Sequence, residues 1–510
     1  MKQFWKTPAG TAAVSALVCG CLTHLYGLVN TMHNYDDIAV HPSGWGTGTI
    51  SGRWFLDLLG KVFDYFCGNY NLTLYNGVVF LLLLAVSAWV LCRVFRIRHR
   101  GIAALLGMLF VVFPVVVSTM MFRYTVIHYG IAILMSVTAG LTIEKKYWGV
   151  PVTAVLICLA LGIYQAYLPL TIGMFVLMLL REALTGESDA FTLVKKGVRD
   201  CVAILLGLAA YLLITKLVLR TSQQELLDYQ GISTMGKIDL QTLPGLVKQA
   251  VKLCLTFVTE NYCALADSRL IRFAYAGLCI VSVGMGFLLM TRGGKTLPVW
   301  VVSVALVGVL PLAVNFIVVM CPGSRIYTLM QYAFVIVGFV PLVLLDSLLQ
   351  SPQIHTRGRE VVKKCVLALS AVLVFGYIYS ANVNYTALYH ANRQAENYMN
   401  SLMTQVRMTD GFTADKKWAL VGKVDDPMYY DGWNEVPRVG GNSKMYSLVN
   451  GYSRCRWFER YMGCQVPELD KEAVAELAQT EEIRAMPCWP DAGSIQVIGD
   501  VVVIKFQDIS

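Results

Sequence analysis

The chain has 510 residues, of which 56% are hydrophobic and 15% are charged, and its mean hydropathy is +0.56. This composition excludes a soluble globular enzyme and indicates a polytopic membrane protein. The net charge of +9 comes from short basic clusters between apolar runs, so it indicates membrane topology and not a nucleic-acid-binding surface.

Apolar runs long enough to cross a membrane define the first part of the chain, residues 1–383. The run from Val150 to Leu180 has basic clusters at both ends and is too long for one helix, so we expect two helices that turn near Tyr164–Pro169. This gives about eleven spans, with a cytoplasmic amino terminus and an outer carboxyl terminus because basic clusters stay in the cytoplasm. The runs begin near Thr11, Leu72, Gly101, Thr125, Val150, Cys201, Arg269, Leu297, Ile326 and Lys364.

The first outer loop, residues 32–71, carries the adjacent acids Asp36 and Asp37 and then a glycine-rich loop, Pro42–Gly52. We expect the acids in extended backbone, with their side chains on opposite sides. Residues 52–66 follow with apolar positions on one face, which predicts an amphipathic helix lying on the membrane surface.

The second outer loop, residues 220–268, is too long for a simple connector. Its apolar stretch Leu243–Val258 has helical spacing and predicts a second surface helix. Two short outer turns each carry one arginine, Arg123 and Arg325, against the usual excess of basic residues on the cytoplasmic side.

Residues 384–510 are water-soluble in character and predict a small extracytoplasmic α/β domain. A polar helix is expected to reach Met408, followed by a strand at Trp418–Gly422 and helices within Ser443–Met462 and Asp470–Ala485. The alternation from Ile495 to Phe506 predicts a hairpin that turns at Gly499–Asp500. Nothing in this domain matches a nucleophile, phosphate-loop or metal motif, so we expect it to shape the acceptor side.

The two acids are the candidate catalytic groups. Glycosyl transfer to a hydroxyl needs a carboxylate that takes the acceptor's proton, so Asp36 or Asp37 is a candidate general base and the other residue orients the loop or meets a cation. The alternative is an ordinary acidic outer loop.

Three arginines are candidate ligands for a donor phosphate, namely Arg53, Arg123 and Arg325. For Arg53 the alternative is an ion pair with Asp57 four residues on, and for the other two it is contact with lipid headgroups.

A substrate cavity is expected around the turn near Tyr164, lined by Trp54, His128, Tyr164, Gln165 and Tyr167. For Tyr164 and Gln165 the alternative is packing inside the helix bundle. The histidines His33, His41 and His128 lie near the same outer edge and leave a divalent metal possible, although no pair has the spacing of a known metal motif.

Three short segments of the chain resemble the first outer loop of polytopic bacterial type II glucosyltransferases, which decorate O-antigen and related surface glycans. They are Asn34-Tyr35-Asp36-Asp37, Gly46-Thr47-Gly48 and Ser51-Gly52-Arg53-Trp54-Phe55. Tyr164–Tyr167 and Ser324-Arg325 are further points of agreement, so the resemblance covers roughly Thr11 to Asn382.

The resemblance implies the C-type membrane glycosyltransferase fold, with a polyprenyl-phosphate sugar as donor, a surface polysaccharide or lipid-linked glycan as acceptor, and inverting transfer on the outer face of the cytoplasmic membrane. It also implies that Asp36 or Asp37 is the catalytic acid residue and that glucose is the sugar by family default.

Two other functions remain as alternatives. A transporter or lipid flippase of the envelope glycan pathway would have ionisable residues at mid-membrane and an inverted internal repeat, and the sequence indicates neither. A receptor or scaffold that binds glycan without chemistry would tolerate the loss of both acids.

Overall fold

The computed structural model describes residues 4–45, 48–227, 241–292, 294–351, 358–424 and 428–508. Gly46 and Thr47 of the glycine-rich loop, and residues 228–240 of the second outer loop, lie outside this description. The chain divides into two compact units. Unit 1 comprises Met1–Val29, Gly44–Asn382 and Pro437–Gly440, and unit 2 comprises Asn30–Ser43, Val383–Val436 and Gly441–Ser510.

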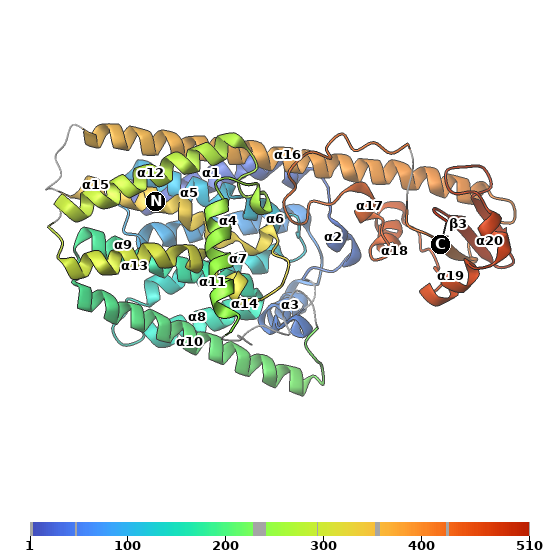
Figure 1. Cartoon of the computed structure of the whole chain (residues 1–510). Coiled ribbons are helices and arrows are strands. Elements are labelled where there is room, and N and C mark those ends of the chain that lie inside the picture. The colour runs from blue at the N-terminus through green and yellow to red at the C-terminus, as the bar shows by residue number, and fades with distance from the viewer. Residues whose placement is uncertain are drawn as a thin grey trace. The chain divides into compact units, whose positions relative to one another are not determined.

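Unit 1 is a bundle of apolar helices (Figure 1). In the described residues, eight helices are long and apolar enough to cross a membrane, or nine if the bent pair α5 and α6 is one span, which makes this a multi-span membrane protein. The prediction of about eleven spans also counted the regions of α7 and α8, which are apolar helices of only 17 and 15 residues. The helices are α1 Pro8–Val29, α3 Trp54–Cys67, α4 Thr73–Val94, α5 Arg100–Val112, α6 Pro114–Met120, α7 Val126–Thr142, α8 Gly149–Ile163, α9 Leu168–Thr185, α10 Ala190–Thr221, α11 Leu243–Thr256, α12 Arg269–Arg292, α13 Leu297–Val314, α14 Ile317–Met320, α15 Val335–Gln350 and the first part of α16 Gly358–Met408.

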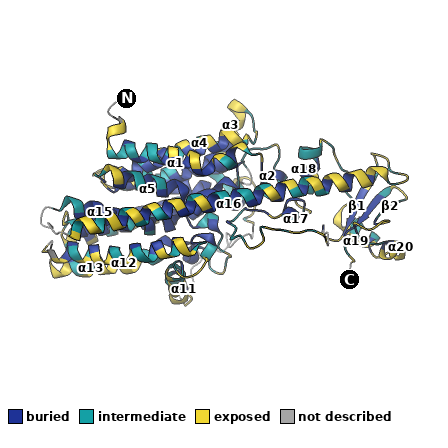
Figure 2. Cartoon of the chain, turned by 90° about the horizontal axis from the view of Figure 1, so that it is seen from above, coloured by how far each residue is buried: buried dark blue, intermediate teal, exposed yellow. Residues whose placement is uncertain are grey.

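Burial differs strongly between these helices (Figure 2). The apolar window that contains α9 is 89% buried and that of α15 is 83% buried, whereas those of α10 and α13 are each 22% buried. The first two helices therefore form the centre of the bundle, and the other two present most of their apolar surface outward, as helices facing lipid do.

Close packing of α1 against α5 depends on a glycine. A Cβ at Gly107 of α5 would lie 2.2 Å from the backbone oxygen of Ala12 in α1. Small residues let helix backbones approach in a membrane, where apolar side chains gain nothing by leaving lipid.

The predicted break in the Val150–Leu180 run is confirmed. Helix α8 ends at Ile163, Tyr164 is extended, and the short turn η3 (Gln165–Tyr167) leads into α9. Arg96 pairs with Glu144 before α8, at 2.9 Å, and with Glu187 after α9, at 2.5 Å. Since the start of α8 and the end of α9 meet at one arginine, the two helices return to the same end of the bundle.

The helix predicted at 52–66 is α3. Its apolar face is strongly exposed, with Tyr65 and Phe66 at 84% and 76%. A helix with such a face is typical of a membrane surface. The second predicted surface helix is α11, which begins at Leu243 as expected.

Unit 2 contains the helix α2 (Tyr35–Ala39), the second part of α16 and a three-stranded sheet. The strands are β1 Lys417–Val421, β2 Ile495–Ile498 and β3 Val501–Lys505, in the order β1-β3-β2. The predicted hairpin is confirmed, since β2 and β3 are antiparallel, while β1 runs parallel to β3. The remaining helices are α17 Met445–Leu448, α18 Arg454–Trp457, the π-helical turn η8 Phe458–Met462, α19 Lys471–Leu477 and α20 Glu481–Ala485.

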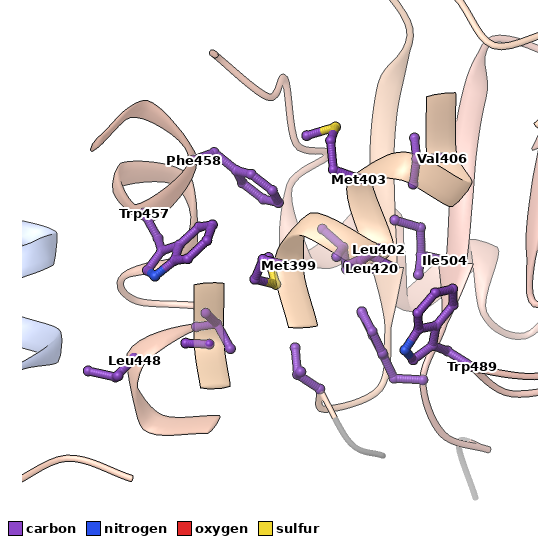
Figure 3. Packing of buried hydrophobic residues seen from close by; sticks show 14 of the residues in the cluster. Met399, Leu402, Met403, Val406, Leu420, Leu448, Trp457, Phe458, Trp489 and Ile504 are labelled. Atoms are coloured by element: carbon purple, nitrogen blue, oxygen red, sulfur yellow. The ribbon is translucent and has the colours of Figure 1, made fainter. Parts of the chain in front are cut away.

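The core of unit 2 forms where α16 lies on the sheet (Figure 3). Met399 and Leu402 of α16 pack among Leu420 of β1, Ile504 of β3 and further buried aromatic residues. Ile38 of α2, from the first outer loop, is a fully buried member of this same core. The two candidate acids therefore belong structurally to the unit built mainly from the carboxyl-terminal part of the chain.

Candidate active site

The acids Asp36 and Asp37 lie in the first turn of α2 and not in extended backbone as predicted. Asn34 caps this helix, because its side-chain oxygen accepts from the backbone N–H of Asp37 at 2.7 Å. The two side chains are therefore about 100° apart around a helix and do not point to opposite sides. Asp37 is fully buried, whereas Asp36 is half-buried.

The residue before the cap is held by an amide from α16. The backbone N–H of His33 donates to the side-chain oxygen of Asn392 at 3.1 Å, and the Asn392 amide nitrogen donates to the His33 carbonyl at 3.0 Å. Tyr461 of η8 donates its hydroxyl to the same Asn392 oxygen at 3.2 Å. The two hydrogen bonds between His33 and Asn392 hold the backbone in place just before α2 begins.

Arg460 of η8 bridges two histidines of the first outer loop. Its Nη2 contacts Nε2 of His33 at 2.7 Å, and its Nη1 contacts Nδ1 of His41 at 3.1 Å. Nδ1 of His33 lies 3.6 Å from Oδ2 of Asp37, and both side chains are fully buried. Burial and the nearby Arg460 charge lower the pKa of His41 below its ordinary value of 6.5.

The contacts of the histidines indicate how well they are placed to bind a divalent metal ion. In the part of the chain that the structure describes, no group of three His, Cys, Asp or Glu side chains could hold a metal ion. His33 and His41 each turn a ring nitrogen toward the Arg460 guanidinium, which is a poor arrangement for ligands of a cation. His128, the third histidine considered, belongs to unit 1, where its ring packs against Phe63 of α3 with centroids 5.7 Å apart.

In unit 1, Arg53 lies in an aromatic cluster at the break between α8 and α9. Its guanidinium carbon lies 4.9 Å from the centre of the Tyr164 ring, and its Nη1 donates to the Tyr129 hydroxyl at 3.3 Å. Tyr129 and Tyr164 stack with centroids 4.7 Å apart, and Tyr167 meets Tyr164 edge-on at 5.3 Å. Asp57, the partner of Arg53 in the alternative interpretation, pairs with Lys61 at 2.9 Å.

Gln165 joins the glycine-rich loop to the bundle. Its amide nitrogen donates to the Ser51 carbonyl and to the Tyr211 hydroxyl of α10, each at 2.9 Å. Gly52 has a φ of +69°, and a Cβ there would lie 2.6 Å from the same hydroxyl. This glycine thus permits close packing of the loop on the bundle.

Trp54 is the remaining residue of the expected cavity. Its ring packs on α8, where a Cβ at Gly162 would lie 2.9 Å from the Trp54 ring. Arg53, Trp54, Tyr164, Gln165 and Tyr167 are thus gathered around one region of unit 1, with Gln165 and the tyrosines buried as in the packing alternative.

The other two arginines differ in setting. Arg123 is 1% exposed, and its guanidinium donates to the carbonyls of Met120 and Gly27. These bonds favour a role in holding α1 and the turn after α6 together. Arg325 is exposed in its turn, with its guanidinium 5.2 Å from the centre of the Tyr327 ring, so it is accessible to an anion.

Sequence reasoning missed Asn392, Arg460 and Tyr461. They are separated from His33 by 359 to 428 positions, and no spacing rule links residues so far apart. It also missed the helix start at Asn34, for which a signal exists, since Asn before two acids is a common helix amino terminus.

A family model described as Glucosyl transferase GtrII matches residues 25–338, more than half of the chain. The match includes Asp36, Asp37, Arg53, the helix break at Tyr164 and Arg325, and it ends before Asn392 and Arg460. No curated protein and no solved structure matches the chain.

Proposed function

The chain belongs to the Glucosyl transferase GtrII family, and from that premise we propose that it moves glucose from polyprenyl-phosphate glucose to a hydroxyl of a cell-surface polysaccharide. The reaction takes place on the outer face of the bacterial cytoplasmic membrane and inverts the anomeric carbon. Membership in a glucosyltransferase family favours this function over the transporter and scaffold alternatives.

The Asp36–Asp37 turn is the proposed source of the general base. In the transfer, the acceptor oxygen bonds to the anomeric carbon, the bond from that carbon to the phosphate oxygen breaks, and the polyprenyl phosphate leaves with the bonding electron pair. The acceptor's proton passes to a carboxylate. We assign this role to Asp36 because its side chain is partly exposed, whereas Asp37 is fully buried beside His33.

Arg53 is the proposed ligand of the donor phosphate, with Arg325 as a second candidate. A guanidinium suits this task because it remains charged and presents paired donors to phosphate oxygens. Tyr129 and Tyr164 orient Arg53 by a hydrogen bond and by a ring face. The attraction between the guanidinium and the leaving phosphate strengthens as negative charge develops on that phosphate. The bonds of Arg123 to backbone carbonyls make it the weakest of the three candidates.

The observation that carries the proposal is the presence of an acid pair in a capped turn within the matched region of a glucosyltransferase family. The test uses the purified full chain in liposomes with radiolabelled polyprenyl-phosphate glucose and a surface polysaccharide acceptor. Asp36→Asn removes the proposed base and should lower the transfer rate by about 10²- to 10⁴-fold. Asp37→Asn should lower it by a smaller factor, because Asp37 orients the turn.

Asp64→Asn is the matched control, since Asp64 is an exposed acid of α3 in the same outer loop. It should retain the wild-type rate. Normal rates in both Asp36→Asn and Asp37→Asn, with unchanged thermal unfolding, would rule out the acid pair as the source of the base.

A further inference from the structure

Three arginines in helix α18 and the adjacent turn η8 have different partners. Arg454 pairs with both oxygens of Glu468 at 2.9 and 3.0 Å, and Arg456 pairs with Glu459 at 2.5 Å. The side-chain contacts of Arg460 in the described structure are instead to two imidazoles, His33 and His41. A cation placed against neutral rings gains less than one placed against a carboxylate, so stability alone does not explain this placement.

The contact with Arg460 determines which nitrogen of His33 carries the proton. An arginine side chain has only donors, so Nε2 of His33, at 2.7 Å from Nη2, must accept. In a neutral imidazole the proton then lies on Nδ1, the nitrogen that is 3.6 Å from Asp37. The order Arg460, His33, Asp37 therefore directs an N–H toward the buried carboxylate.

The same contact places the guanidinium against the ring nitrogen that carries no proton in this tautomer. Among the described residues, the charged and titratable groups near this ring include Asp37 of α2, Arg460 and Tyr461 of η8, Glu396 of α16 near Tyr461, and His41 on the other arm of Arg460.

The backbone around Arg460 is also unusual. Residues Phe458–Met462 form a π-helical turn, a rare conformation that occurs often at functional sites. Arg460 and the adjacent Tyr461 both reach the His33 region from this turn, one through the ring nitrogen and the other through Asn392.

We propose that Arg460 is a positioning residue for the Asp36–Asp37 turn, which it holds by fixing the tautomer of His33. This inference rests on the proposed function and deepens it, because it assigns part of the site to a residue beyond position 338, where the family match ends. The sequence indicated only that the carboxyl-terminal domain shapes the acceptor side. With Arg460 in this role, the domain also contributes to catalysis.

The test compares Arg460→Gln and Arg460→Lys with wild type in the full-length protein. Arg460→Gln should lower kcat by about tenfold or more, with a smaller change in KM. Arg460→Lys keeps a donor for one histidine and should recover part of the rate. Arg393→Gln, which removes an exposed arginine paired with Glu396, is the matched control and should behave as wild type.

A readout that does not need activity is the NMR signal of His33 in protein with isotopically labelled histidine, assigned by loss of the signal in His33→Gln. Wild type should show the Nδ1–H tautomer of His33. Arg460→Gln should show a mixture of the two tautomers. If Arg460→Gln does not fold, Arg460→Lys is measured in the same way, with a smaller change expected.

The outcomes separate this inference from the proposed function. If wild type transfers glucose but Arg460→Gln keeps its rate and the Nδ1–H tautomer of His33, the role of Arg460 is contradicted and the proposed function stands. If wild type transfers no glucose from the polyprenyl donor, the proposed function fails whatever the His33 signal shows.

Discussion

At the scale of single residues, burial and charge around the acid turn predict a dependence of stability on pH. The pKa of His41 is lowered from its ordinary 6.5, mainly by burial and next by Arg460. Between the lowered value and about 6.5, the unfolded chain binds a proton that the folded chain does not. The free energy of unfolding should therefore be highest above about pH 6.5 and should fall as the pH is lowered through that window.

His41→Gln removes this titration, so its unfolding temperature should change less between about pH 7.5 and pH 5.5 than that of wild type. The control is His390→Gln, which removes an exposed imidazole that stacks on Trp433 in the same unit and should keep the wild-type dependence. An equal loss of stability in wild type and His41→Gln over this range would contradict the account of His41.

The sequence predicts the candidate residues of the site but not the residues that contact them. The candidates Asp36, Asp37 and Arg53 follow from local pattern, because the acid pair and the amphipathic helix lie within a short stretch. Their partners do not, because His33 meets Arg460 across 427 positions and Arg53 meets Tyr129 across 76. Only folding brings these residues together.

At the scale of elements, the helix pair α1 and α5 offers a test of packing. Gly107→Ala places a Cβ 2.2 Å from the Ala12 backbone oxygen, which cannot move without displacing α1. We expect a loss of about 1–3 kcal/mol in stability, typical of overpacking a close contact. It is measured as a lower unfolding temperature of the protein in detergent.

Gly101→Ala is the matched control within α5, since a Cβ at Gly101 has no atom within 4 Å in the described structure. It should leave the unfolding temperature unchanged or slightly raised, because alanine favours a helix more than glycine does. Equal unfolding temperatures for Gly107→Ala and Gly101→Ala would contradict the packing of α1 on α5.

Most elements follow from sequence because length and periodicity determine them. Basic clusters at both ends of the Val150–Leu180 run require an even number of crossings, and the structure has the break at Tyr164. Helix α16 ends at Met408 and the hairpin turns at Gly499, as predicted. The helix α2 was missed because five residues are too few to show a period, and its formation depends on the Asn34 cap and on burial of Ile38.

At the scale of the whole molecule, the division into units differs from the order of the chain. The sequence places a domain boundary at residue 383, whereas unit 2 combines residues 383–436 and 441–510 with residues 30–43 of the first outer loop. Conversely, the four residues Pro437–Gly440 belong to unit 1, where the Ser118 hydroxyl donates to the Gly440 carbonyl at 2.7 Å. Sequence order could not reveal this exchange, because it depends on long-range contacts such as that of Ile38 with the core of unit 2.

The central claim is that the outer face of the membrane is the place of transfer and that the donor is a lipid-linked glucose. The most direct measurement uses sealed membrane vesicles of known orientation that contain the full chain and receive radiolabelled glucose either as polyprenyl-phosphate glucose or as a nucleotide sugar. We expect label to reach the polysaccharide from the polyprenyl donor, on the side corresponding to the cell exterior, and Asp36→Asn to lower the rate of this transfer by about 10²- to 10⁴-fold. Transfer from the nucleotide sugar without the lipid donor, or transfer only on the cytoplasmic side, would contradict the central claim.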